Sequence, residues 1–518
     1  MAADTPKDAA ISRHLALSTV SNYAGQIVNL AVWFLLTPFL VHRLGASQYG
    51  LWMLVSSFIA YGSLLDFGVG EAIVKYVAEF RARGDSESAS RLVATSLWLY
   101  CGLGLLVLLI GIVIAPLVPK IINVPPSEAH TATVLVILTA LGVAVELPAT
   151  AAYSVLRGLH RFDLMNLIGS SAIIALAVGW VLVVLLGGGV LGMAAIVIPL
   201  TLIWQVPAIA LIHRTAPDLR FGLRGPERGM VRSVATFSSA LFGINVAAVV
   251  KGKTDEIVIG ASLPVAAVAP YSIARRLSGL PGQLAYQFVR VLMPLASRLH
   301  AEGDAALLRG LYTASMRLTI GLFTVVAGGL IVFAGPFLAA WVGPRYAHSS
   351  DIVVILTFAG LAEALLWPAA QLLQGMNRHR PLVAFALGSA ALNLALSIIL
   401  IGPLGVKGVA FGTLIATSLE ALIVVPFAAR VTQVQGRTVL ADVLVPAILP
   451  VVPMVAVLAL IRGTLAPSTI ATIAIAGLAG AVVYAAGYLA FPVAVRERAM
   501  VARILGGARG AGRALARR

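Results

Sequence analysis

Stretches of about 20 apolar residues recur along this chain from residue 15 to residue 491, separated only by short polar connections. Each stretch is long enough to cross the roughly 30 Å hydrocarbon core of a bilayer as a helix. Because 60% of the residues are hydrophobic and only 11% are charged, the chain has too little polar surface to cover a soluble domain. The sequence therefore predicts an all-α membrane protein that crosses the bilayer many times.

We predict about fourteen membrane-spanning helices from these stretches and the polar residues between them. The predicted spans are residues 15–41, 48–76, 92–118, 131–156, 164–186, 190–212, 232–262, 265–296, 311–341, 352–374, 382–401, 406–429, 440–461 and 467–491. The longest connections, 77–91 and 213–231, are short and basic. We therefore expect no separate extramembrane domain.

The 37 Lys and Arg residues are distributed unevenly between the two sides of the predicted membrane. If the N-terminus is cytoplasmic, 27 of them lie in cytoplasmic loops and ends and five lie in outer loops. This asymmetry is the positive-inside pattern that sets topology. It predicts a multi-pass membrane protein with both termini cytoplasmic, and we expect it in the bacterial cytoplasmic (inner) membrane. The net charge of +16 then reflects topology, and we expect no nucleic-acid binding.

The chain also repeats itself at an offset near 217 residues. The matched landmarks are Gly45-Ala46-Ser47 with Gly260-Ala261-Ser262, Arg81–Asp85 with His300–Asp304, and Arg157–Arg161 with Gln374–Arg378. Each copy holds six predicted spans, and an even number gives both copies the same orientation. Such a parallel repeat places a binding site between the two halves.

The repeat gives a predicted domain organisation. We expect a cytoplasmic N-terminus (1–14), an N-lobe of spans 1–6 (15–212), a cytoplasmic inter-lobe loop (213–231), a C-lobe of spans 7–12 (232–430), spans 13 and 14 (431–491), and a basic cytoplasmic tail (492–518).

Three stretches carry motifs: Leu44–Trp52 (LGASQYGLW), Leu65–Gly70 (LDFGVG), and Thr254–Gly260 (TDEIVIG), which is followed by Tyr271–Ala274 (YSIA). At these residues the chain resembles the multidrug/oligosaccharidyl-lipid/polysaccharide exporter superfamily, and most of all its Wzx-type polysaccharide and O-antigen flippases. The resemblance covers roughly residues 15–430. It implies two six-helix lobes that form a V open alternately to each side. It also implies an undecaprenyl-diphosphate-linked oligosaccharide as substrate.

Seven charged residues interrupt the apolar sequence of the seventh and eighth predicted spans: Lys251, Lys253, Asp255, Glu256, Arg275, Arg276 and Arg290. A charge inside a membrane span costs roughly 3 kcal/mol on insertion scales, so it persists where it is paired or faces water or a ligand. Five of the seven are cationic, which indicates an anionic ligand. We therefore expect the cations of this cluster to contact substrate.

The spacing of these charges predicts their depth and their local pairs. Lys251 lies 12 residues before Leu263 and Arg275 lies 12 residues after it. At about 1.5 Å per residue, both are expected about 18 Å below the turn between the two spans, near mid-bilayer. Asp255 can pair with Lys251, and Glu256 can pair with Lys253, because they lie four and three residues further along a helix. The alternative role for both lysines is therefore to pin helices together.

The arginines lack such local pairs, because the eighth span contains no acid. A guanidinium group binds phosphate through two donors at once, so Arg275 and Arg276 are the strongest diphosphate candidates. A polar face continues at helical spacing through Gln283 and Gln287 to Arg290, interrupted where Pro281 should break or kink the helix. Arg290 lies near the cytoplasmic end, where it could instead extend to the interface.

Three amides of the first span, Asn22, Gln26 and Asn29, recur at roughly helical spacing. Uncharged amides suit sugar hydroxyls, so this helix is a candidate lining of the substrate site. Hydrogen bonding between helices is an equal alternative.

The acids that we expect to be buried are Asp66, Glu71, Glu146, Glu363 and Glu420. An isolated carboxyl in apolar surroundings can take up a proton or a cation, so the candidate coupling residues are Asp255, Glu256, Asp66, Glu71 and Glu363. Asp66 and Glu71 could instead neutralise Lys75 or another base near the cytoplasmic face.

The resemblance, together with the cationic cluster, implies a flippase that moves undecaprenyl-diphosphate-linked oligosaccharide from the cytoplasmic to the outer leaflet by alternating access. The alternatives are an organic-cation antiporter of the same superfamily, which should have an acid-rich site, and a lipid II flippase, which typically carries arginine in its first helices. We expect no enzymatic activity, no cofactor and no metal site. We expect a monomer whose partners are the lipid-linked glycan, membrane lipid and polysaccharide-assembly proteins.

Overall fold

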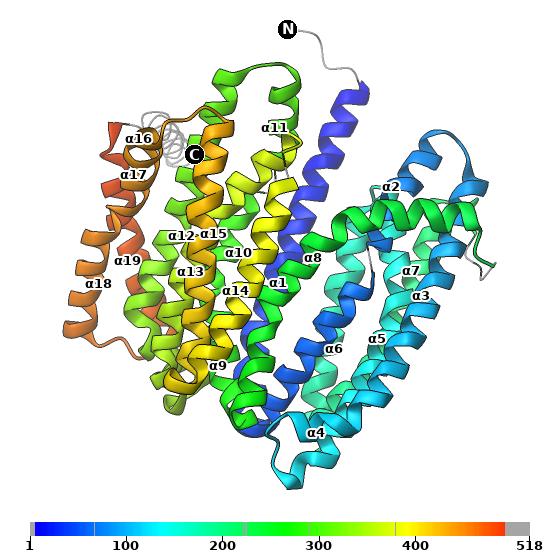
Figure 1. The fold of residues 1–518 in the computed structure, drawn as a ribbon, viewed down its shortest axis with the longest axis horizontal. Coiled ribbons are helices and arrows are strands. Elements are labelled where there is room, and N and C mark those ends of the chain that lie inside the picture. The colour runs from blue at the N-terminus through cyan, green and yellow to red at the C-terminus, as the bar shows by residue number, and fades with distance from the viewer. Residues whose placement is uncertain are drawn as a thin grey trace, which may run out of the picture. The chain divides into compact units, whose positions relative to one another are not determined.

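The computed structural model describes residues 6–492 except Phe67, Phe221, Leu223, Arg224, Arg290 and His379, and the described residues form helices and no strands (Figure 1). Its contacts divide the chain into two compact units, with the boundary between Ser272 and Ile273. The two units are described one at a time.

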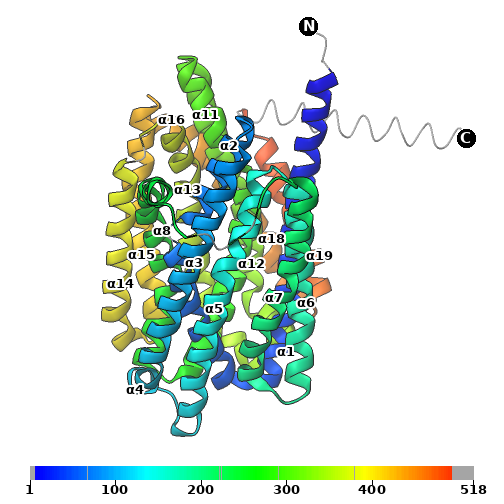
Figure 2. The same cartoon turned by 90° about the vertical axis from the view of Figure 1, so that its right-hand side faces the viewer.

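The first unit is built from eight α-helices and part of a ninth. They are α1 (Pro6–Gly62), α2 (Val69–Ala82), α3 (Ser86–Ile114), α4 (Val118–Ile121), α5 (Ala129–Gly158), α6 (Phe162–Leu185), α7 (Gly189–Thr215), α8 (Arg228–Ser262) and α9 (Val268–Ser278), with 3₁₀ turns η1 (Ser63–Asp66), η2 (Ala115–Leu117), η3 (Pro126–Glu128) and η4 (Val265–Ala267). Helix α5 packs between α3 and α7, and α1 packs on α6 (Figure 2). The core between α2, α3 and α5 centres on Tyr100, Ile73 and Val155, all fully buried.

The second unit continues from α9 and contains ten further α-helical segments. They are α10 (Leu280–Val289), α11 (Leu292–Ala301), α12 (Ala305–Val342), α13 (Ser350–Gly375), α14 (Arg380–Leu404), α15 (Val406–Val431), α16 (Gly436–Thr438), α17 (Val445–Ile448), α18 (Val451–Leu465) and α19 (Ile470–Leu489), with the 3₁₀ segment η5 (Pro344–Ser349) and the π-helical η6 (Val439–Leu444). Helix α15 packs on α13 and α14, and α18 and α19 pack on α12. The Tyr484 hydroxyl donates to the Ala447 carbonyl at 2.6 Å and so ties α19 to the rest of this unit.

Eleven helical segments among the described residues are long and apolar enough to cross a membrane, compared with the fourteen predicted. The first two predicted spans are one element, α1, whose two halves meet at Gly45 (φ 74°, ψ 175°). The second predicted span is also interrupted further along, by η1 and by Gly68 (φ 78°) before α2 begins. A left-handed φ is readily available to glycine, so both breaks occur where the sequence permits them.

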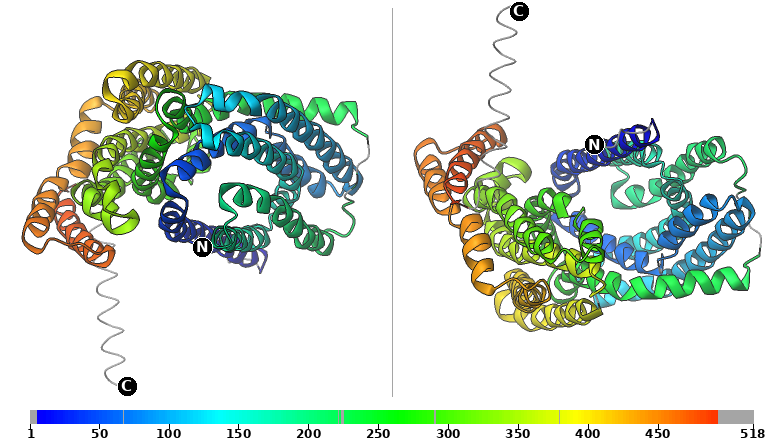
Figure 3. Two further views of the ribbon diagram at one scale, coloured as in Figure 1. Left: turned by 90° about the horizontal axis from the view of Figure 1, so that it is seen from below. Right: turned by 90° about the horizontal axis from the view of Figure 1, so that it is seen from above.

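The seventh and eighth predicted spans are not among the eleven. Helix α8 has the predicted length, but four charges between Lys251 and Glu256 lower its apolar character. Its first turns lie across α2 and α3, and its later turns run toward the end of the unit where α4 lies (Figures 1 and 3). The eighth span is divided into α9, α10 and α11, and the first break, at Gly279, lies two residues before Pro281, close to where the sequence predicted it.

The repeat landmarks adopt the same local structure in both copies. Gly84 and Gly303 have φ values of 73° and 72°, and each precedes an aspartate that caps the next helix through a backbone N–H three residues on. His160 and Asn377, 217 positions apart, both have a φ of 57° at the end of a helix. Similar backbone geometry at matched positions supports the internal repeat inferred from the sequence.

Candidate functional site

The charged stretch of α8 contains two acids that are almost completely enclosed. Asp255 is 0% exposed and Glu256 is 1% exposed, whereas Lys251 and Lys253 are half-buried. The Tyr271 hydroxyl donates to Asp255 Oδ2 at 2.5 Å, and the Tyr61 hydroxyl shares a hydrogen bond with Thr254. A buried carboxylate needs such hydrogen bonds to offset its lost hydration. The sequence indicated Tyr271 only as part of a motif, and it did not indicate Tyr61.

The two halves of the predicted charge cluster belong to different units. Lys251 and Lys253 lie in the first unit, whereas Arg275 and Arg276 lie in the last turn of α9 within the second. Both arginines are half-buried. The pairing of the lysines with the acids of α8, and the common depth of Lys251 and Arg275, stay predictions. Arg290 lies outside the described residues.

Helix α10 presents one face to its own unit and leaves another exposed. Trp367 of α13 packs closely on Gly282, since a Cβ added to this glycine would lie 2.9 Å from the Trp367 ring. The centroid of the Tyr286 ring lies 5.2 Å from that of the Trp367 ring. On the other face Gln283 is exposed and Gln287 is half-buried. Leu284 and Phe288 are exposed as well, so this face is mixed rather than uniformly polar.

The amides of α1 are partly available at the surface. Gln26 is exposed and Asn29 is half-buried, while the side chain of Asn22 lies outside the described part of the structure. Helix α1 approaches α6 through Gly25, where an added Cβ would lie 3.3 Å from Asn166 Oδ1. Gly25 makes this contact between the two helices, whereas the side chain of its neighbour Gln26 is exposed.

Asp66 lies at the break between η1 and α2, a position that the sequence pattern did not reveal. Its Oδ1 accepts a hydrogen bond from the hydroxyl of Tyr100, which is 0% exposed, and another from the backbone N–H of Gly70 at 3.2 Å. The carboxylate thus caps the first turn of α2, where the helix dipole favours negative charge. The structure places one half-buried acid at the point where the second predicted span is interrupted.

The other candidate acids differ in their surroundings. Glu71 is exposed and accepts hydrogen bonds from both terminal nitrogens of Arg157, at 2.9 and 3.3 Å. Its charge is therefore neutralised by a basic residue, as the alternative role predicted. Glu146 is also exposed, so the expectation of burial is wrong for these two residues. Glu363 on α13 and Glu420 on α15 are half-buried.

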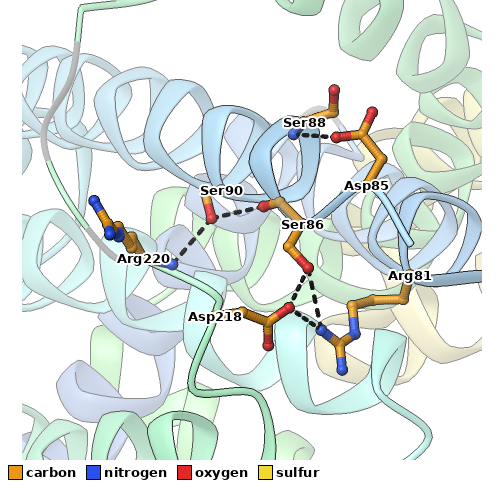
Figure 4. A network of polar contacts seen from close by, with 7 residues as sticks. All are labelled: Arg81, Asp85, Ser86, Ser88, Ser90, Asp218 and Arg220. Atoms are coloured by element: carbon orange, nitrogen blue, oxygen red, sulfur yellow. Dashed lines mark hydrogen bonds and ion pairs between the residues drawn. The ribbon is translucent and has the colours of Figure 1, made fainter. Parts of the chain in front are cut away.

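A polar network that the sequence did not predict joins α2, α3 and the connection from α7 to α8 (Figure 4). Arg81 donates to Asp218 at 2.6 Å, and the Ser86 hydroxyl donates to the same carboxylate. The backbone N–H of Arg220 donates to Ser90 Oγ at 3.0 Å. The hydrogen bond from Ser86, a backbone hydrogen bond and the charge of Arg81 together hold the pKa of Asp218 below its usual value. These contacts tie the predicted inter-lobe loop to the first unit.

A cavity of about 550 Å³ lies beside this network. Its lining is Ser86, Glu87, Ser90, Ala94, Asp218, Arg220 and Gly222. Among the described residues, no three His, Cys, Asp or Glu side chains come together to hold a metal ion.

The helical arrangement defines a polytopic membrane protein. A solved lipid II flippase MurJ in an inward closed conformation has a similar fold, with a TM-score of 0.68 at 15% identity over 92% of this chain and 99% of that one. An inward-facing multidrug resistance MATE family transporter of the MOP superfamily matches with a TM-score of 0.64 at 14% identity, over 78% of this chain and 94% of that one. Both solved structures share the fold of this chain.

The particular family follows from sequence comparison. A family model described as "Polysaccharide biosynthesis protein" matches residues 40–351, and the chain belongs to this family. The membrane protein EpsK of Bacillus subtilis is 24% identical over 81% of this chain and 83% of its own length. The probable low-salt glycan biosynthesis flippase Agl15 of Haloferax volcanii is 21% identical over 79% of this chain and 82% of its own.

Proposed function

We propose that this protein flips an undecaprenyl-diphosphate-linked oligosaccharide from the cytoplasmic to the outer leaflet by alternating access. The observation that carries the proposal is a difference in burial. The acids Asp255 and Glu256 are enclosed, whereas the neighbouring cations Lys251 and Lys253 keep partly exposed side chains. A ligand reaching α8 therefore meets positive charge, which favours an anionic headgroup over an organic cation.

The arginines of α9 are proposed to bind the diphosphate. Arg275 and Arg276 are half-buried, and a guanidinium group can bind two phosphate oxygens at once. The exposed face of α10, which carries Gln283 as well as Leu284 and Phe288, suits an amphiphile with a polar headgroup and an apolar chain. Gln26 and Asn29 of α1, together with Gln287, are proposed to contact sugar hydroxyls.

Asp66 is the coupling residue that we favour. Its carboxylate caps α2 and is bonded to a buried tyrosine, so a change in its protonation would alter how α2 begins. Asp255, Glu256 and Glu363 are further candidates. Glu71 is less suitable, because Arg157 already neutralises it.

The remaining assignments follow from the charge asymmetry and from the family. We place the protein in the bacterial inner membrane as a monomer with both termini cytoplasmic. Membrane lipid and polysaccharide-assembly proteins are its proposed partners.

The direct test combines Arg275→Ala with Arg276→Ala in vesicles that contain the purified protein and a fluorescent undecaprenyl-diphosphate-linked oligosaccharide. Loss of transfer between leaflets at normal expression is the expected result. The matched control is Arg298→Ala, because Arg298 is exposed and already paired with Glu302 in its own helix. Unchanged flipping in the double variant would remove the site assignment.

The same vesicles separate the two rival functions. Transport of a lipophilic organic cation that outcompetes the glycan would indicate a drug antiporter. Transfer of lipid II in preference to the glycan would indicate a peptidoglycan flippase. We expect neither, because the accessible charge of α8 is positive and α1 presents neutral amides.

A further inference from the structure

Asn123, in the turn after α4, makes three hydrogen bonds to the corner between α8 and η4. Its backbone N–H donates to the Gly260 carbonyl at 3.0 Å, its side-chain amide donates to the Ala261 carbonyl at 3.0 Å, and its own carbonyl accepts from the Val265 N–H at 3.1 Å. One residue therefore binds both sides of this corner. We call this group of contacts the Asn123 staple.

Two glycines let the backbones meet beside the staple. An added Cβ on Gly50 of α1 would lie 2.3 Å from the Val265 carbonyl oxygen, which is a backbone atom and cannot move aside cheaply. An added Cβ on Gly260 would lie 2.1 Å from Leu54 of α1 and 3.5 Å from Ile122. Close approach of this kind requires glycine on one of the two surfaces. The corner therefore rests on α1 as well as on the turn after α4.

The staple joins the two copies of the internal repeat. Gly50 and Asn123 belong to the first copy, whereas Gly260 is part of the landmark that matches Gly45 in the second. Helix α3 begins at Ser86 in the Arg81–Asp218 network and ends at Ile114, shortly before Asn123, so the staple lies at the opposite end of the first unit from this network (Figure 1), which is the expected outer end. A transporter that opens outward by moving its repeats apart must break contacts at this place.

We propose that the Asn123 staple is the outer gate of the transport cycle, formed in this structure and broken when the outer side opens. The inference rests on the proposed flipping function for its role, but its geometry is independent of the substrate. The staple contains neutral hydrogen bonds and no ion pair. Water can therefore replace each bond when the corner between α8 and η4 moves away from Asn123. Its partners are mainly backbone groups, so few substitutions other than those at Asn123 and the two glycines should disturb it.

A cysteine cross-link tests the gate directly. Cys101 is the only cysteine, so Cys101→Ser gives a background without thiols, to which Asn123→Cys and Ala261→Cys are added. We expect oxidation to stop flipping of the fluorescent lipid-linked oligosaccharide and reduction to restore it. If the cross-linked protein still flips the glycan at the full rate, the proposal that the staple is the outer gate is wrong. A background protein that does not flip the glycan would count against the proposed function alone.

A second measurement needs no substrate. Val265 is 1% exposed, so Val265→Cys should react slowly with a membrane-impermeant maleimide while the staple is formed. In the Val265→Cys protein, a second substitution Gly50→Ala should raise the labelling rate several-fold, because the added Cβ collides with the Val265 backbone. Asn123→Ala removes only the side-chain hydrogen bond to Ala261, so it should raise the labelling rate less. Gly102→Ala is the control, because its added Cβ meets no atom within 4 Å. Equal labelling in all four proteins would overturn the proposal even if every variant is folded.

Discussion

The hydroxyl of Tyr271 donates a hydrogen bond of 2.5 Å to the carboxylate of Asp255, across the turn that joins α8 to α9. Asp255 is fully enclosed, so this bond replaces part of the hydration that the carboxylate loses on folding.

Tyr271→Phe should therefore destabilise the protein by about 1–3 kcal/mol, the usual cost of removing a hydrogen bond to a buried charged group. Thermal unfolding in detergent measures the effect. Tyr286→Phe is the matched control, because that ring packs on Trp367 and lies half-buried in the second unit. Equal melting temperatures for the two variants would show that Asp255 does not depend on Tyr271.

Asp66→Asn should uncouple transport of the lipid-linked oligosaccharide from the ion gradient that drives it. The amide keeps the size of the side chain and can still accept from Gly70, but it cannot ionise. We expect exchange of the lipid-linked oligosaccharide between leaflets to continue while accumulation driven by an imposed ion gradient is lost. Vesicles with and without the gradient give both rates. Asp351→Asn, at an exposed pair with Lys407, should keep driven transport; gradient-driven accumulation by Asp66→Asn would exclude Asp66 as the coupling residue.

The connection between α7 and α8 should loosen in acid. The pKa of Asp218 is lower in the folded protein than its usual value of about 3.9, so its bonds to Ser86 and Arg81 stabilise the fold above that pH. This stabilisation is lost as the pH falls through the folded-state pKa. Hydrogen exchange of residues 216–227, corrected for intrinsic rates, should accelerate below about pH 4. In Asp218→Asn the exchange should be faster at neutral pH and show no such acceleration.

The two repeat copies should respond alike to substitution at their matched glycines. Gly84→Ala and Gly303→Ala each place a side chain at a φ near 73°, which should cost about 1 kcal/mol. Gly310→Ala in α12 is the control, because its added Cβ meets open space. A similar drop in melting temperature for the first two and none for the third is expected. If only one of the pair is sensitive, the landmarks are not equivalent.

Local signals in the sequence predicted the elements that local chemistry determines. Pro281 predicted the break in the eighth span, and the repeat landmarks that contain Gly45, Asp85 and Asp304 lie where helices end or begin. Each depends on the conformational preference of one residue or on a capping side chain, so its neighbours in the chain are sufficient to identify it.

Contacts between distant residues could not be read in this way. Tyr100 reaches Asp66 across 34 positions and Arg157 reaches Glu71 across 86, and no spacing rule relates such pairs. The break at η1 was missed because Leu65–Gly70 looked apolar enough to continue a span. The enclosure of Asp255 and the exposure of Glu146 were missed because hydropathy along the chain does not say which side of a helix faces its neighbours.

Because Asp218 and Arg220 are bonded to α2 and α3, only the part of the connection after Arg220 can span the distance to α8. Leu219 between them is fully buried, and Arg220 is bonded to Ser90, so the connection is held to α3 as far as Arg220. From Arg220 to Glu227 there are seven residue steps, which reach about 25 Å when fully extended. The network thus acts as a tether of fixed length. It limits how far the start of α8 can travel from α3, whatever force moves it.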